Sequence, residues 1–233
     1  MNAHLALASA AMLISLAFAL STLERWLDKR KPHEAAWTAA LFLFAAASAS
    51  LLLGVALGWN GLWFRLFYLF GAIINVPYLA LGTIFLLGGQ RWGRPATAFV
   101  HSFTAFSAGV IAVAPLRGPI PRDSLPQGSD VFGALPRVLA AAGSGIAALI
   151  IVGGALWSAA RFARRASTRR LAYANGLIAA GTLVLGAGGV LNSVLDEMDG
   201  FAVSLVVGIT LLFAGFLITN ERPRAALQLV DAA

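Results

Sequence analysis

The sequence predicts an all-α membrane protein, built as a bundle of seven transmembrane helices in a single domain. Two observations lead to this prediction. Hydrophobic residues make up 59% of the chain and charged residues only 12%, whereas a soluble domain has about 45–50% and about 25%. The chain also contains seven apolar stretches that are each long enough to cross a bilayer, which takes about 20 helical residues.

The seven stretches are rich in Leu, Ala, Val and Phe and do not alternate between apolar and polar residues, so they favour helices over transmembrane β-strands. We expect spans near residues 3–23, 35–57, 62–87, 96–114, 138–160, 171–195 and 201–219. No Lys or Arg precedes the first span, whereas a cleavable signal peptide needs a basic start. The first span is therefore expected to remain as a helix.

Positive charges are concentrated after the first, third, fifth and seventh spans. They are Arg25, Lys29, Arg30, Lys31, Arg91, Arg94, Arg161, Arg164, Arg165, Arg169, Arg170, Arg222 and Arg224. The other side has only Arg117, Arg122 and Arg137. The positive-inside rule then predicts an external N-terminus and a cytoplasmic C-terminal tail at 220–233. We expect anionic lipids of the inner leaflet as partners.

Nucleic acid is not expected as a partner, because no aromatic platform accompanies the basic residues. The 15 Arg against 2 Lys are typical of a bacterial source with GC-rich DNA. We therefore expect a multi-pass protein of the bacterial cytoplasmic (inner) membrane.

The longest connection, residues 115–136, contains five of the nine prolines. It is expected to be an extracellular, non-helical strap between the fourth and fifth spans. Two interpretations remain open: an irregular connector, or a lid over the outer end of the bundle.

The first three and last three spans can be aligned with each other. Sliding the chain by 136 residues pairs Arg25-Trp26 with Arg161-Phe162 and Ala36-Trp37 with Ala172-Tyr173. An odd fourth span lies between the two halves, so a repeat would be parallel, in a 3+1+3 arrangement. Chance similarity between basic loops of Ala- and Leu-rich helices explains the match equally well.

A 3+1+3 chain with an external N-terminus resembles microbial opsins and SWEET-type sugar carriers in helix count and orientation. Arg65 near the outside and Pro77 mid-membrane resemble the third helix of opsins. However, Gly71 stands where the opsin resemblance implies a counter-ion carboxylate, and the span 201–219 contains no lysine. Retinal is therefore excluded as a cofactor. The proline that the carrier resemblance implies in the first and fifth spans is also missing.

Polar residues inside the spans are the candidates for a functional site. Arg65, Tyr68 and Asn75 share one face of the third span, and Tyr78 flanks that face. Pro77 removes a backbone donor and frees a carbonyl, which predicts a kink beside Asn75.

Arg65 needs a partner, and the end of the sixth span offers Asp196, with Asn192 on the same face. The predicted ligand-binding set is Arg65, Tyr68, Asn75, Tyr78, Asn192 and Asp196. Three roles remain open for Arg65: a charge pair that fixes helix packing, an anion site in an outward cavity, or snorkelling to the headgroups.

His101 in the fourth span is a candidate proton relay or a hydrogen-bonded residue of a polar core. A haem would usually want a second axial histidine, and His4 and His33 lie near opposite membrane ends. No haem and no other cofactor is therefore expected. Glu34 follows His33 at the start of the second span, where a carboxylate suits the positive end of the helix dipole.

Glycines are frequent in the fifth and sixth spans and favour close helix packing. This fits either a monomeric bundle or a homo-dimer formed through the fifth span. The chain has no cysteine, no phosphate-binding loop, no metal-binding cluster and no nucleophile elbow, so an enzyme is not the favoured class.

The first functional hypothesis is a protein that binds or transports a small apolar or amphiphilic solute in an interior cavity between the third and sixth spans. The alternative is a receptor-like or accessory protein that acts through its basic cytoplasmic loops. A second alternative is an intramembrane enzyme that uses His101.

Overall fold

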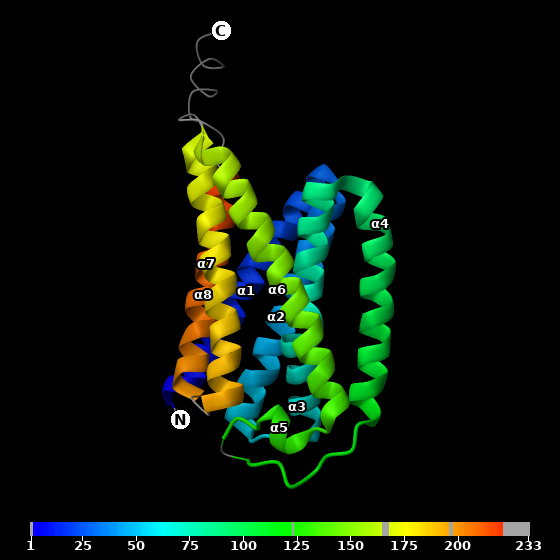
Figure 1. Cartoon of the computed structure of the whole chain (residues 1–233). Coiled ribbons are helices and arrows are strands. Elements are labelled where there is room, and N and C mark those ends of the chain that lie inside the picture. The colour runs from blue at the N-terminus through cyan, green and yellow to red at the C-terminus, as the bar shows by residue number, and fades with distance from the viewer. Residues whose placement is uncertain (1, 123, 165–167, 196–197, 221–233) are drawn as a thin grey trace.

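The computed structural model describes residues 2–122, 124–164, 168–195 and 198–220, and it is all-α in these ranges. The elements are α1 (Asn2–Lys29), α2 (Pro32–Leu57), α3 (Gly61–Phe67), the π-helix η1 (Tyr68–Ile74), α4 (Asn75–Val113), α5 (Gly128–Val131), α6 (Ala134–Ala163), α7 (Arg169–Leu195) and α8 (Met198–Asn220). The predicted helical class is confirmed. Figure 1 shows the long helices running side by side in a bundle.

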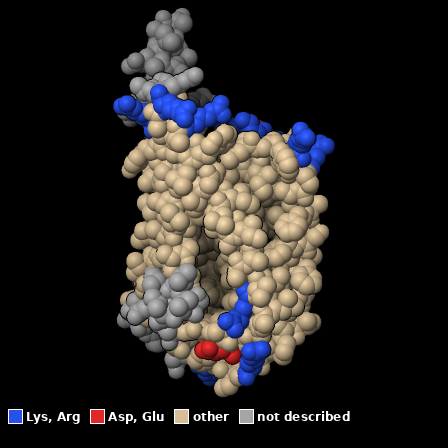
Figure 2. All heavy atoms as spheres, viewed as in Figure 1, with Lys and Arg blue, Asp and Glu red and all other residues tan. Residues whose placement is uncertain are grey.

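Six helices in the described part of the chain are long and apolar enough to cross a membrane. Large apolar side chains cover their outer faces: Leu149 is 75% exposed and Phe99 is 69% exposed. An aqueous surface would not tolerate so much exposed apolar area. Figure 2 shows that the flank of the bundle carries almost no charge, whereas Lys and Arg gather at its ends. The protein is a polytopic membrane protein.

One of the six, Gly61–Val113, is 53 residues long and contains two antiparallel arms. Gly89 alone leaves the helical conformation, with φ 65° and ψ −163°, a region that glycine enters without steric cost. Figure 1 shows α4 folding back on itself at the basic end of the bundle. We call residues 75–88 the first arm and residues 90–113 the second arm.

The two arms of α4 contact each other at several levels below the turn. Leu81 of the first arm and Val100 of the second belong to one buried cluster. A Cβ atom at Gly93 would lie 2.1 Å from the Phe85 ring, so this ring of the first arm packs directly on the backbone of the second arm. With this turn counted, seven helices follow one another across the apolar layer, and the predicted helix count is confirmed.

The connection 115–136 is not wholly irregular, because α5 forms one helical turn within it. This differs from the expected non-helical strap. Leu125, Val131 and Phe132 of this segment are buried, and the Phe132 ring stacks on Phe64 with 5.3 Å between centroids. The segment is more ordered than expected because these apolar side chains, which lie between its prolines, hold it against the end of the bundle. Figure 1 shows it passing below α3 and α6.

Candidate functional site

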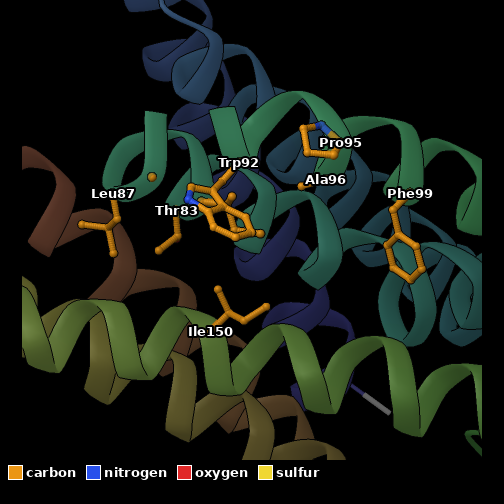
Figure 3. Close-up of a pocket in the computed structure, with 9 residues that line it drawn as sticks. Thr83, Leu87, Trp92, Pro95, Ala96, Phe99 and Ile150 are labelled. Carbon is orange, nitrogen blue, oxygen red and sulfur yellow. The ribbon is translucent and has the colours of Figure 1, made fainter. Parts of the chain in front are cut away.

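An apolar groove lies between the two arms of α4 and the neighbouring helix α6. Its larger part has a volume of about 540 Å³ and is lined by residues that include Thr83, Leu87, Trp92, Ala96, Phe99 and Ile150. A deeper part of about 180 Å³ adjoins it and extends to Pro77, Phe103 and Gly143. Figure 3 shows Thr83 and the Trp92 indole facing α6, with Ile150 opposite them. We call this feature the α4–α6 groove.

Two glycines of α6 set the width of the groove. A Cβ atom at Gly154 would lie 2.9 Å from both Leu87 and Thr83, and one at Gly143 would lie 2.7 Å from the Phe103 ring. The α6 backbone therefore touches α4 at these two levels, while Ile146 and Ile150 stand between them. The glycines that the sequence indicated as packing residues of the fifth span thus shape the groove. Gly145 and Gly153 meet nothing within 4 Å.

The chemistry of the groove is almost purely hydrocarbon. Among its lining residues, only Thr83 and Trp92 carry a polar side-chain atom. The Thr83 hydroxyl donates to the Leu79 carbonyl of its own helix at 3.3 Å. Trp92 is 64% exposed and Ile146 is 62% exposed, so the groove opens sideways, toward the lipid. An apolar chain can enter it without crossing a polar barrier.

Arg65, the first member of the predicted polar set, holds the end of the second arm. Its Nη1 donates to the Ile111 carbonyl, and its Nη2 donates to the Ala114 carbonyl at 2.7 Å. Ile111 is in the last turn of the arm and Ala114 is the residue that follows it, and carbonyls at this end of a helix have no partner within the helix. The guanidinium carbon also lies 5.9 Å from the Phe132 ring centroid. Arg65 thus ties the second arm and the loop to α3.

The predicted partner of Arg65 cannot be placed beside it. Asp196 lies outside the described residues, and so does the side chain of Asn192 on α7. The Arg65–Asp196 pair stays a prediction.

Tyr68 and Asn75 lie at the two ends of the π-helix η1. The Tyr68 ring packs against Phe132, with 5.1 Å between centroids. Asn75 is 3% exposed, and its Oδ1 accepts from the Val76 backbone N–H at 2.7 Å. Asn75 is thus buried and Tyr68 is half-buried; their role in a ligand site stays a prediction.

The carbonyl freed by Pro77 is found where the sequence predicted a kink. In π-helical register the Ala72 carbonyl would accept from residue 77, which as proline has no N–H. The Ser144 hydroxyl of α6 donates to this carbonyl instead, at 2.5 Å. The lost backbone bond is thus replaced by a bond between helices.

Replacing Ser144 with alanine is expected to destabilise the protein by about 1–3 kcal/mol, because the Ala72 carbonyl is left without a donor. The measurement is the unfolding free energy in detergent. Ser129→Ala is the matched control, since the partners of that hydroxyl among the described residues, Gln127 and Asp130, belong to its own surface loop. Equal losses in the two variants would contradict a specific role for the Ser144–Ala72 bond.

Tyr78 and His101 face each other across the two arms of α4, with ring centroids 5.8 Å apart. His101 itself is exposed on the flank of the bundle. The structure therefore brings these two predicted residues together, but away from Arg65 and Tyr68. In the described residues no group of three His, Asp or Glu side chains is arranged to hold a metal ion.

A buried carboxylate at the basic end is the feature that sequence reasoning missed. Glu34 in the first turn of α2 is fully buried, and its Oε1 accepts from Arg25 Nη2 of α1. His33 Nε2 lies 3.6 Å from the same oxygen. The guanidinium carbon of Arg25 lies 4.7 Å from the Phe216 ring centroid of α8. We call Arg25, His33, Glu34 and Thr38 the Glu34 cluster.

A signal for this cluster existed in the sequence. Arg25 and Glu34 flank the short turn between the first two spans, so antiparallel helices bring them to the same level. Thr22 and Thr38, one helical turn further into the membrane on each helix, are also buried. Complementary charges with polar neighbours on facing helices indicate an internal pair rather than two solvated ends.

The chain was compared with protein-family models, with curated proteins and with solved structures, and none of them matches. The interpretation of both sites therefore depends on their geometry.

Proposed function

We propose that this membrane protein binds an apolar or amphiphilic molecule that enters the α4–α6 groove from the bilayer. The observation that carries the proposal is the groove itself, with about 540 Å³ of space, a hydrocarbon lining and a lateral opening. Pockets for small molecules are mostly apolar with few polar groups. The solute class is the one expected from the sequence. The third expected span lines the groove as predicted, but the other walls belong to the fourth and fifth spans (the second arm of α4 and α6) in place of the sixth.

The length of the groove favours an extended chain as the occupant. Its lining on the first arm runs from Pro77 to Gly88, which at 1.5 Å per residue is about 16 Å of helix. Trp92 stands at the end nearest the turn, and the exposed Arg91 and Arg94 flank that turn. A molecule with an acyl chain and an anionic head would place its chain in the groove and its head beside these arginines.

The orientation follows from the same charges. Exposed arginines, among them Arg161, Arg164 and Arg169, occupy the end at which α6 ends and α7 begins, and Figure 2 shows the basic side chains along that edge. The positive-inside rule supports placing this end in the cytoplasm of a bacterial inner membrane. The basic end also supports the alternative of an accessory protein that contacts an anionic partner there.

A fluorescent fatty acid tests the proposed function. We expect a dansyl-labelled fatty acid to bind the purified protein in lipid nanodiscs saturably, above the signal of empty nanodiscs. Ile150→Trp is expected to weaken binding about tenfold or more, because the indole fills the groove. Leu149→Trp is the matched control, since Leu149 is the neighbouring α6 residue and is not among the groove lining.

Retained binding in both tryptophan variants, or no saturable binding in the unmodified protein, would contradict the proposal. The second of these results would favour the accessory role of the basic end.

A further inference from the structure

The middle of the second arm of α4 carries two polar side chains on its outer surface. The arm spans residues 90–113, so its midpoint falls between His101 and Ser102, and both residues are exposed. At 1.5 Å per residue they lie about 17 Å from either end of the arm, near the centre of a hydrocarbon layer about 30 Å thick. Ionisable side chains at this depth almost always face the interior of a bundle or a water-filled cavity.

These two side chains have no hydrogen-bond partner in the part of the chain that the structure describes. His101 contacts the Tyr78 ring, and Ser102 makes no side-chain contact of this kind. By contrast, the hydroxyls of Thr97 and Thr104 on the same arm each donate to a carbonyl of their own helix at 2.8 Å. Lipid tails offer neither donors nor acceptors. A partner for His101 and Ser102 must therefore come from outside the bundle.

The surface around these side chains suits the close approach of another helix. Small residues follow one another there at alternating spacings of four and three, which keeps them on one face of the helix, and all of them are exposed. They are Ala98, Ser102, Ala105, Gly109 and Ala112. We call these residues and His101 the outer face of the second arm. Small residues at this spacing let helix backbones approach within a membrane.

This face points away from the rest of the bundle. Val100, which packs against the first arm, is two positions from Ser102 and therefore about 200° away around the helix. A Cβ atom at Gly109 would meet nothing within 4 Å. Figure 1 shows the second arm, labelled α4, at the edge of the bundle. The outer face is thus open to a neighbour along its length.

A second copy of this chain fits the polar groups of this face. Copies in one membrane share their orientation, so a twofold axis along the membrane normal sets the two second arms parallel and level. At 100° per residue, His101 lies on one side of Ala98 and Ser102 on the other. The twofold axis therefore brings His101 of each copy against Ser102 of the other. Neutral imidazole and hydroxyl groups each offer a donor and an acceptor, so the face is complementary to itself.

We propose that the outer face of the second arm is the interface of a homodimer, held at mid-membrane by two symmetric His101–Ser102 hydrogen bonds. This differs from the dimer through the fifth span that its glycines suggested. The exposed residues of α6 between 138 and 156 are all apolar, so α6 has no polar group at this depth that needs a partner. The interface is separate from the α4–α6 groove, so the failure of one proposal does not affect the other.

Energy transfer between copies in liposomes tests the interface. The chain has no cysteine, so Gln90→Cys, at an exposed position beside the turn, carries a single dye on each copy. We expect transfer between donor- and acceptor-labelled copies at low protein density, and Gly109→Leu should abolish it by separating the two arms. Gly153→Leu is the matched control, because this exposed glycine of α6 also meets nothing within 4 Å. Neither leucine clashes within one copy, so the helical circular dichroism of both variants should be unchanged.

A double-mutant cycle tests the hydrogen bond itself. His101→Leu and Ser102→Ala should each raise the dissociation constant of the dimer about tenfold, since either change removes the same pair of interhelical bonds. The double variant should be little weaker than either single one, because residues that share a bond are not additive. Thr104→Val is the control and should leave the dimer unchanged, since that hydroxyl bonds to its own helix.

Three results would overturn the proposal. One is the absence of energy transfer in the otherwise unmodified protein. Another is transfer that survives Gly109→Leu or that is lost equally in Gly153→Leu, which would place a dimer contact on α6. The third is an unchanged dissociation constant in His101→Leu, or effects of His101→Leu and Ser102→Ala that simply add, because the two side chains would then not bond to each other.

Discussion

Replacing Gly181 with valine is expected to destabilise the bundle by about 3 kcal/mol or more. Gly181 of α7 faces α8 so closely that a Cβ atom would lie 2.8 Å from the Gly208 carbonyl oxygen and 3.0 Å from the Leu212 nitrogen. Both are backbone atoms, which cannot turn aside as a flexible side chain can. The helices must separate, and overpacking of this kind costs about 1–3 kcal/mol even for smaller additions.

The effect of Gly181 should extend beyond one contact, because the α7–α8 seam repeats. A Cβ atom at Gly188 would meet Ser204, and one at Gly215 would lie 2.7 Å from the Ala174 carbonyl oxygen. Ala174, Gly181 and Gly188 are seven residues apart, which keeps them on one face of α7. Small residues at this spacing let two helices approach within the membrane. Separation at Gly181 therefore loosens its neighbours as well.

Gly186→Val is the matched control for this prediction. Gly186 is on the same helix, and a Cβ atom there meets nothing within 4 Å. The measurement is the unfolding free energy of both variants in the same detergent. A loss at Gly181 no larger than that at Gly186 would show that the close approach of α7 and α8 does not contribute to stability.

The fold was largely predictable from the sequence, because a span of the bilayer needs a long apolar helix and little else satisfies it. The turn between the third and fourth helices was the main difference in detail. The expected spans ended at residue 87 and resumed at 96, yet the helices break only at Gly89. One glycine with positive φ suffices to reverse the chain, and hydropathy alone does not show how short a turn can be.

The candidate sites were predictable only in part, because periodicity describes one helix at a time. It correctly placed Asn75 on a buried face and Pro77 beside a freed carbonyl. It could not show that Arg65 bonds to backbone carbonyls of the second arm, since those acceptors exist at the end of every helix. It also gave no measure of the gap between α4 and α6, which depends on Gly143 and Gly154.

For Glu34, the explanation from its own helix was correct but incomplete, because the residue also makes a tertiary contact. A carboxylate in the first turn of a helix is stabilised by the helix dipole, and this explanation required no partner. The structure buries that carboxylate fully against Arg25. A local explanation for a charged residue near a membrane boundary is therefore incomplete until the facing helix has been considered.

Removing Arg25 is expected to have the largest effect of any single charge change described for this protein. Arg25→Gln leaves the fully buried Glu34 carboxylate without its cation, and loss of one partner from a buried pair costs about 3–5 kcal/mol. Glu34→Gln should cost less, because the cation that remains is partly exposed and lies over Phe216. The double variant should recover part of the loss, since two neutral amides replace the pair. The measurement is the unfolding free energy of the four proteins at neutral pH. Arg161→Gln is the control, because Arg161 is exposed, stacks over Trp157 and pairs with no carboxylate in the part of the chain that the structure describes.

The pH dependence of Arg25→Gln separates a buried charge from lost packing. Without the cation, Glu34 binds a proton more readily in the folded protein than in the unfolded chain. The folded state then holds more protons, so its stability rises as the pH falls. We therefore expect the deficit of Arg25→Gln to shrink between about pH 7 and about pH 5, whereas a loss of packing alone would leave it constant. A constant deficit, or one equal to that of Glu34→Gln at every pH, would mean that the buried carboxylate does not determine the stability of the α1–α2–α8 junction.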